Sequence, residues 1–437
     1  MIKLYDYQKS QIQKGISGVN INLSDVGTGK TFVGLGLYQE LVKKANFNKL
    51  LIICLASKVS DFASDALEMG LSVTPLDKGT KRNKELLGAS NNVSISFESV
   101  WRLEDLKSWV DSKTMILIDE SHKVKNPTSK VGYFVRELSA HCGYTYQMTA
   151  TPITNGKLEE WYNQLTIAGK LDMTYRTFKK KYTIEELQST KVAGGRERYF
   201  NQIVGYQNTD ELDALVNGST VFQQRILTDD MQPITVTYEF KKPTMYGKIQ
   251  KQRVVTLDDG TVKEYDSTSS IYHALRQLAS GVLNGIGKTI KKDKLTRLKD
   301  LLDTLDERVV IFYTYDSELH SIREMLDNIK RPYSMYNGQT HDRTTFTNEH
   351  NGVCLVQYKA GATGVNGFQI ASVGVFYSQP SGSTEYIQAV GRIHRIGQKK
   401  APIIYNFITA NSVESKVADM IAQGKDITDA MKGDLIK

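Results

Sequence analysis

Residues 19–41 read VNINLSDVGTGKTFVGLGLYQEL, and this stretch decides the fold. A short apolar run leads into a glycine-rich segment, and a segment with helical spacing follows it. A phosphate-binding loop requires this order, because glycines let backbone N–H groups approach phosphates and the N-terminus of a helix favours negative charge. We therefore expect Lys30 to reach the β and γ phosphates of a nucleotide and the Thr31 hydroxyl to bind Mg²⁺.

The glycine-rich segment departs from the strict phosphate-loop pattern at one position. That pattern has glycine six residues before the lysine, where this chain has Ser24. Gly27, Thr28 and Gly29 complete the expected nucleotide-binding loop. The residues alone leave one alternative open, a glycine-rich turn that only connects a strand to a helix.

Short β-branched runs form two series along the chain. The first lies at 19–23, 49–55, 93–97, 114–118 and 144–148, and the second at 309–313, 353–357, 373–377 and 403–407. Alternation with amphipathic, helix-length segments is typical of strands buried on both faces of a parallel sheet. The two series therefore predict two doubly wound α/β domains.

The region between the two series, 167–292, has a different character. It contains a lysine cluster at 179–181, a Gly194-Gly195 turn and a helical stretch at 271–282. An Asp-Gly pair within 258–260 favours a tight hairpin turn. We interpret this region as the end of the first domain plus helical and hairpin insertions, so the predicted domains are 1–166, 167–292 and 293–437.

Two carboxylates follow an apolar run at 115–118. Strand ends face the ligand crevice in open α/β sheets, so we expect Asp119 to hold Mg²⁺ and Glu120 to orient the attacking water. A helix-capping Asp-Glu pair is the alternative. His122 lies close by without other histidines or cysteines, which indicates a hydrogen-bonding link from the ATP site and not a metal ligand.

Two arginines stand three residues apart in the segment 388–398, QAVGRIHRIGQ. This spacing places Arg392 and Arg395 on one helix face. A planar, permanently charged guanidinium suits the charge that develops on a γ-phosphate. A solvated basic helix turn is the alternative.

Composition excludes several classes of protein. The formal net charge of +8 suits a polyanionic partner without proving one. The chain has no apolar run of about eighteen residues, so we expect no membrane association. Its start lacks the apolar core of a signal peptide, and Cys54, Cys142 and Cys354 lie too far apart for a disulfide framework. A reducing, cytoplasmic compartment is expected.

Taken in order, the motifs resemble those of superfamily 2 helicases, and specifically of Swi/Snf-type ATPases. The matching segments are 4–8 (motif Q), 25–31 (I), 119–122 (II), 148–155 (III), 359–366 (V), 394–398 (end of VI) and 412–414 (closing helix). The resemblance implies an α/β fold of two tandem RecA-like parallel-sheet lobes, a P-loop NTPase with helical and hairpin insertions. The chain shows no nuclease, zinc or histone-reader module, and in this respect it resembles the small motor proteins found in phage and bacterial genomes.

The resemblance also implies roles for individual residues. The expected ATP-binding residues are Gln8 (adenine), Gly27, Thr28, Gly29, Lys30, Thr31, Asp119, Gly364, Arg392 and Arg395. The expected catalytic residues are Lys30, Glu120, His122, Gln388, Arg392 and Arg395, with Thr149 and Thr151 as coupling residues. The expected nucleic-acid contacts are Ser57, Lys58, Ser99, Gly361 and Thr363, and the segment 96–99 belongs with them.

Three positions differ from the family pattern. Motif I is one residue shorter than usual, motif Ia lacks its usual tryptophan, and Gln357-Tyr358 replaces a Ser-Thr pair before motif V. Because Gln357-Tyr358 replaces the Ser-Thr pair, the resemblance gives less support for a DNA contact just before motif V.

The function expected from the resemblance is that of an ATP- and Mg²⁺-dependent nucleic-acid motor that translocates along duplex DNA. Single-stranded and forked DNA are alternative partners. An RNA-dependent ATPase and a nucleotide-switched DNA-binding scaffold are alternative functions, and a restriction-type motor subunit is a third. We expect a monomer in the cytoplasm of a bacterial or phage-infected cell.

Overall fold

The computed structural model describes residues 4–191, 197–223, 232–257, 259–286, 289–358, 367–395, 398–427 and 429–436. The chain divides into two compact units, Met1–Arg225 and Ile226–Lys437. The predicted division at 1–166, 167–292 and 293–437 remains a prediction. Within the described ranges, none of the helices is both long enough and apolar enough to cross a bilayer.

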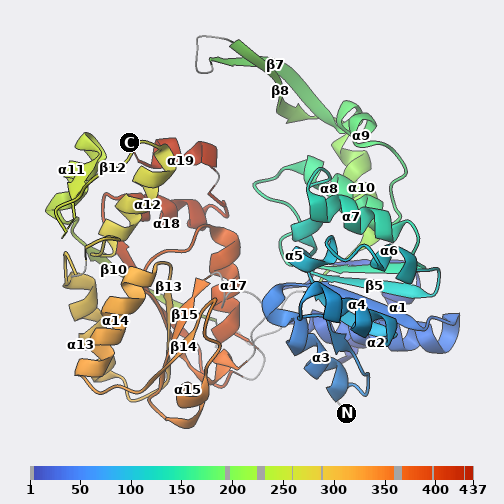
Figure 1. Ribbon diagram of the computed structural model, residues 1–437, viewed down its shortest axis with the longest axis horizontal. Helices are drawn as coiled ribbons and strands as arrows, with labels where there is room; N and C mark the ends of the chain where they lie inside the picture. The colour runs from blue at the N-terminus through green and yellow to red at the C-terminus, as the bar shows by residue number, and fades with distance from the viewer. Residues whose placement is uncertain are drawn as a thin grey trace. The chain divides into compact units, whose positions relative to one another are not determined.

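The first unit is built on a parallel sheet (Figure 1). Over its described residues this sheet has seven strands in the order β3-β4-β2-β5-β6-β1-β9. Their bounds are β1 Ile21–Asn22, β2 Lys49–Cys54, β3 Thr74–Pro75, β4 Asn92–Ser96, β5 Thr114–Asp119, β6 Tyr144–Met148 and β9 Thr220–Val221. The strand order makes β2, β5, β6 and β1 consecutive neighbours, so their carboxyl ends lie side by side on one edge.

Helices cover both faces of this sheet. Their bounds are α1 Asp6–Ile16, α2 Lys30–Ala45, η1 Ala56–Lys58, α3 Val59–Glu68, α4 Thr80–Gly88, α5 Phe97–Val100, α6 Leu106–Trp109, η2 Ser121–Val124, α7 Lys130–Ser139, η3 Leu158–Glu160, α8 Trp161–Ile167, α9 Tyr175–Tyr182 and α10 Thr209–Ser219. Successive residues of β5 point to opposite faces. Met115 and Leu117 pack toward α1, α2 and α3, whereas Ile116 and Ile118 pack toward α5, α6 and α7. Burial on both faces explains the continuous apolar run in the sequence.

An antiparallel ribbon follows α9 in the first unit (Figure 1). Its strands are β7 Thr183–Lys191 and β8 Glu197–Tyr206, with an irregularity in the register between Ile184 and Glu185. The Tyr206 hydroxyl at the base of the ribbon donates a 2.5 Å hydrogen bond to Glu159 Oε2. The ribbon is therefore attached to the segment that follows β6.

The second unit has its own parallel sheet. Among the residues placed there, six strands follow the order β10-β17-β16-β13-β15-β14. Their bounds are β10 Ile234–Phe240, β13 Val309–Tyr313, β14 Tyr333–Tyr336, β15 Val353–Gln357, β16 Val373–Phe376 and β17 Ile403–Thr409. The expected hairpin near 258–260 is present as the antiparallel pair β11 Val254–Thr256 and β12 Val262–Glu264.

Helices also cover both faces of the second sheet. Their bounds are α11 Thr244–Gln252, α12 Thr268–Ala279, α13 Asp293–Thr304, α14 Asp316–Asn328, α15 Thr344–Asn348, η5 Phe368–Ile370, α17 Ser383–Ile393, α18 Val413–Ala422 and α19 Asp429–Leu435. Helices α13 and α14 pack on one face, and α15, η5 and α17 pack on the other. Helices α11, α12, α18 and α19 share a separate apolar cluster. The predicted α/β fold with two parallel-sheet lobes is confirmed.

Candidate active site

The glycine-rich loop connects β1 to α2, which begins at Lys30. Gly27 and Gly29 have φ angles of 87° and 73°, in the left-handed region that favours glycine. A Cβ atom on Gly29 would lie 2.5 Å from Gln8 Nε2. The backbone conformation therefore favours glycine at position 29, and a side chain there would displace the Gln8 amide.

Helix α1 holds the end of this loop through two side chains. The Gln8 amide donates to the Thr28 carbonyl at 3.1 Å and to the Gly29 carbonyl at 3.4 Å. The Tyr7 hydroxyl donates to the same Thr28 carbonyl at 2.8 Å. The structure thus places Gln8 against the loop, and its predicted contact with adenine remains a proposal. Sequence reasoning missed Tyr7.

Ser24, the departure from the strict loop pattern, belongs to a buried polar network. Its hydroxyl accepts a 2.8 Å hydrogen bond from Gln11 Nε2, and its backbone N–H donates to Asn22 Oδ1 at 3.0 Å. Asn22 donates in turn to the Tyr146 hydroxyl of β6 at 3.1 Å. Sequence reasoning missed this network, although the polar Asn22 in an otherwise apolar run was a signal for it.

Lys30 projects back over the loop. Its ammonium group donates to the carbonyl oxygens of Ser24 at 2.7 Å and of Asp25 at 3.0 Å. Burial lowers the pKa of Lys30 to about 8, with the carboxylates of Glu120 and Asp119 acting in the opposite direction. The lysine therefore lies in the same electrostatic environment as the two predicted acidic residues.

Asp119 and Glu120 stand at the carboxyl end of β5, as predicted. Glu120 has φ 55° and ψ 53°, a left-handed conformation that costs a non-glycine residue about 1–3 kcal/mol. Burial disfavours its charged form, but the hydrogen bond and charge of His122, joined by nearby lysines, lower the pKa of Glu120. These interactions favour the ionised form of the carboxylate.

His122 links this carboxylate to the end of β6. Its Nδ1 atom lies 3.3 Å from Glu120 Oε2 and 3.1 Å from Thr149 Oγ1. The Thr149 hydroxyl also accepts a 3.1 Å hydrogen bond from the Thr151 backbone N–H. All four residues were predicted site residues, and the structure brings them together.

Lys58 lies in a position that the sequence did not indicate. Its ammonium group forms a 2.8 Å ion pair with Asp119 Oδ2, and the two side chains are 13% and 6% exposed. Lys58 ends the short helix η1 directly after β2, the neighbour of β5 in the sheet. Its predicted contact with a nucleic-acid backbone remains a prediction.

A second ion pair joins the segments that follow β5 and β6. Lys125 contacts Glu160 Oε2 at 2.8 Å and donates to the Thr154 hydroxyl. The same Glu160 oxygen accepts a 2.6 Å hydrogen bond from the Thr154 backbone N–H. The segment after Thr151 is thus connected to the segment after His122.

The oxygen ligands available at this edge fit Mg²⁺. This ion is usually held by one or two carboxylates together with substrate phosphates, not by a cage of protein ligands. Asp119 offers a carboxylate, and Thr31 offers a hydroxyl in the first turn of α2. No group of three or more His, Cys, Asp or Glu side chains suited to a metal occurs among the described residues. The donor set therefore matches a metal bound jointly with a nucleotide.

The predicted residues of the second unit lie on α17 and just after it. Gln388 and Arg392 are buried on this helix, and Arg395 follows it. Helix α17 packs closely on the sheet, because a Cβ atom on Gly374 of β16 would lie 2.5 Å from Ile393 Cδ1. Gln398 donates to the carbonyl of Ala371 at 2.8 Å.

Two of the predicted nucleic-acid segments share one sheet edge. Ser57 follows β2, and Ser96 ends β4, with Cys54 and Ser96 paired in register. The Ser96 hydroxyl accepts a 3.2 Å hydrogen bond from the Ser99 backbone N–H, which caps the short helix α5. The predicted residues Gly361, Thr363 and Gly364 lie outside the described residues.

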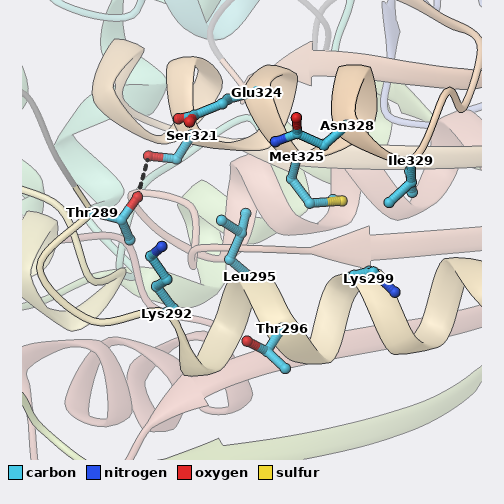
Figure 2. A pocket seen from close by; sticks show the side chains of 10 residues that line it. All are labelled: Thr289, Lys292, Leu295, Thr296, Lys299, Ser321, Glu324, Met325, Asn328 and Ile329. Atoms are coloured by element: carbon cyan, nitrogen blue, oxygen red, sulfur yellow. Dashed lines mark hydrogen bonds between the residues drawn. The ribbon is translucent and has the colours of Figure 1, made fainter.

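A pocket of about 220 Å³ lies between α13 and α14 in the second unit. Figure 2 shows Lys292, Lys299 and Glu324 among its polar side chains and Leu295 and Met325 among its apolar ones. None of the predicted site residues line it. The candidate site is therefore defined by the sheet edge and not by this pocket.

Comparison with known proteins identifies the family of this chain. The model of the SNF2-related domain matches residues 18–278, and that of the helicase conserved C-terminal domain matches residues 293–397. An uncharacterized ATP-dependent helicase, YqhH of Bacillus subtilis, is 23% identical over 97% of this chain and 78% of its own length. The yeast transcription regulatory protein SNF2 (Saccharomyces cerevisiae) is 24% identical over 97% of this chain.

The chain spans 27% of the length of the yeast protein. Among solved structures, the SWI2/SNF2 ATPase core of Sulfolobus solfataricus in complex with dsDNA is 19% identical, with a TM-score of 0.44 over 100% of this chain and 93% of that chain. The match to the SNF2-related domain covers more than half of the sequence. The chain belongs to the SNF2-related family and is an ATP hydrolase with two parallel-sheet lobes.

Proposed function

We propose that this protein is a DNA-dependent ATPase that translocates along duplex DNA, with ATP bound at the carboxyl edge of the first sheet. One observation carries the ATPase part of the proposal. Lys30 at the start of α2 and the two acidic residues at the end of β5 share one electrostatic environment on the same edge of the sheet, where β6 lies between β1 and β5. A phosphate-binding lysine beside a metal-binding and a water-orienting carboxylate is the arrangement that ATP hydrolysis needs.

In this proposal each group of the first unit has a separate task. The loop N–H groups and Lys30 hold the β and γ phosphates of ATP. Asp119 and Thr31 hold Mg²⁺, which neutralises charge on the phosphates. Glu120 accepts a hydrogen bond from the attacking water and aligns it, a role that suits a carboxylate whose pKa lies below its ordinary value.

The second unit contributes the arginines. Arg392 and Arg395 reach the γ-phosphate when the two units close on ATP, and they stabilise the charge of the transition state. Gln388 on the same helix faces the nucleotide. Hydrolysis and product release then reopen the units, which converts turnover into movement.

The link from hydrolysis to DNA runs through His122. This residue contacts both Glu120 and Thr149, and Thr151 bonds to the same threonine hydroxyl. A change in Glu120 on loss of the γ-phosphate is therefore passed to the segment after β6. Ser57 and Ser99, on the same sheet edge, bind the phosphate backbone of DNA.

The test is steady-state ATPase activity measured without nucleic acid and with duplex DNA, single-stranded DNA, forked DNA and RNA. We expect duplex DNA to stimulate turnover most strongly. Stronger stimulation by RNA would support an RNA-dependent ATPase in its place. Nucleotide binding without turnover under every condition would support a nucleotide-switched scaffold.

A further inference from the structure

Lys58 and Asp119 come from adjacent strand ends and meet inside the candidate active site. Strands β2 and β5 pair in parallel, with Ile53 opposite Ile118 as the last pair. The chain after each strand therefore leaves the sheet at the same edge. The resulting ion pair is 2.8 Å long and largely shielded from water, with side-chain exposures of 13% and 6%.

The carboxylate in this ion pair is the one that the proposed function assigns to the metal. An ammonium group 2.8 Å from Asp119 Oδ2 already occupies one lone-pair direction of that oxygen. Two cations held this close to one carboxylate also repel each other, and burial weakens the screening by water. We therefore expect Lys58 and Mg²⁺ to oppose each other's binding to Asp119.

We propose that Lys58 is an internal cation that competes with Mg²⁺ for Asp119 and thereby sets how strongly metal and nucleotide bind together. The proposal rests on the proposed function, because it takes Asp119 as the metal-binding carboxylate. Without metal, the Lys58 charge adds to that of Lys30 and supports the binding of the negatively charged nucleotide. With metal, Lys58 must leave Asp119, and part of the metal's binding free energy is used for that displacement.

Removal of the lysine should therefore change the coupling between the two ligands in a defined direction. Coupling between sites is reciprocal, so it can be measured as the ratio of nucleotide affinities with and without metal. In Lys58→Met the affinity without metal should fall, and the gain in affinity on adding Mg²⁺ should be larger than in the wild type. We expect this gain to increase about tenfold, within the usual range of coupling between two sites.

A Lys58 that supports metal binding predicts the opposite change in the gain of nucleotide affinity on adding Mg²⁺. If Lys58 only orients Asp119, holding one oxygen so that the other faces the metal, its removal should reduce the gain on adding Mg²⁺. The sign of the change thus separates a competing lysine from a supporting one. Lys58→Arg keeps the charge and should stay near the wild-type value under the competing role.

The same strand supplies a matched control. Lys49 begins β2 and forms a 2.7 Å ion pair with Asp111, with side-chain exposures of 23% and 46%. This pair lies at the amino end of the strand, away from the loop and from Asp119. Lys49→Met should leave the gain on adding Mg²⁺ unchanged.

The experiment is titration of the full chain into a fluorescent ATP analogue, followed by anisotropy, in buffer with EDTA and in buffer with Mg²⁺. The variants are Lys58→Met, Lys58→Gln, Lys58→Arg and Lys49→Met, each checked for folding by circular dichroism. The proposal is supported if adding Mg²⁺ raises nucleotide affinity more in Lys58→Met and Lys58→Gln than in the wild type, while Lys58→Arg and Lys49→Met stay near the wild type. An unchanged or smaller gain in the two neutral variants overturns it.

Failure of the proposed function would look different. In that case the wild type would bind no nucleotide, or Mg²⁺ would not affect its binding. A wild type that binds nucleotide with help from Mg²⁺, together with neutral variants that show the same gain, would overturn the inference about Lys58 alone.

Discussion

Replacement of Lys294 by methionine should destabilise the second unit by about 3–5 kcal/mol, the cost of leaving one member of a buried ion pair without its partner. The Lys294 and Glu414 side chains are only 3% and 2% exposed. The ammonium group donates to both carboxylate oxygens, at 2.8 and 2.7 Å, and to the carbonyls of Tyr377 and Phe407. Its loss would leave Glu414 charged and buried, with a 2.7 Å hydrogen bond from the Thr409 backbone N–H as a remaining contact.

Urea denaturation can assign this loss to the second unit. All three tryptophans, Trp101, Trp109 and Trp161, belong to the first unit, so tryptophan fluorescence reports on that unit. Circular dichroism reports on both units. The urea midpoint of the second unit, followed by circular dichroism, should fall by roughly 2 M. This value assumes that the unfolding free energy decreases by about 2 kcal/mol per M urea. The fluorescence midpoint should stay in place.

Helix α13 supplies the control for this experiment. Lys299 pairs with Asp303 on the same helix at 2.5 Å, but these side chains are 45% and 49% exposed. Lys299→Met should change the stability little, because exposed ion pairs are screened by water. The double variant Lys294→Met with Glu414→Leu should recover most of the lost stability, because apolar residues often replace a buried pair without cost. A shift for Lys294→Met no larger than that for Lys299→Met would refute the reasoning.

The remaining predictions concern ATP and DNA. Glu120→Gln should abolish turnover but keep ATP bound, whereas Lys30→Ala should weaken nucleotide binding itself. Normal ATP hydrolysis by Glu120→Gln would show that Glu120 does not orient the attacking water. Arg392→Ala and Arg395→Ala should each spare much of the nucleotide affinity and lower DNA-stimulated turnover by about 10³-fold, the scale known for arginine fingers. Near-normal turnover in both arginine variants would exclude a site shared by the two units. Affinity for DNA should fall steeply between about 50 and 200 mM salt, because phosphate contacts release counterions, and a flat response would contradict backbone tracking.

The strand predictions were most accurate where both faces of a strand are buried. The runs at 309–313 and 353–357 coincide with β13 Val309–Tyr313 and β15 Val353–Gln357, which are nearly continuous apolar segments. Strand β10 was missed, although Ile234–Phe240 alternates in the manner of a half-exposed strand. It lies at the edge of the sheet and pairs with β17 from far along the chain. Its sequence did not show that it belongs to this sheet.

The candidate site was predicted as a set of motifs but not as a set of contacts. Parallel strands place their carboxyl ends on one edge, so Lys30, Asp119 and Thr149 could be expected near one another. The ion pair between Lys58 and Asp119 depends on β2 lying beside β5, and strand order is not encoded in any local motif. Contacts between side chains 61 residues apart therefore required the structure.

The serine in the glycine-rich loop shows how one local departure is compensated. Gln8 and Gln11 are three residues apart, which places them on one face of α1. Gln11 holds the beginning of the loop through the Ser24 hydroxyl, and Gln8 holds its end through the carbonyls of Thr28 and Gly29. Glycine at position 24 could not accept the Gln11 hydrogen bond, and a buried amide would then lose a partner. One helix face thus holds both ends of the loop, so the serine helps to keep the loop in one defined conformation.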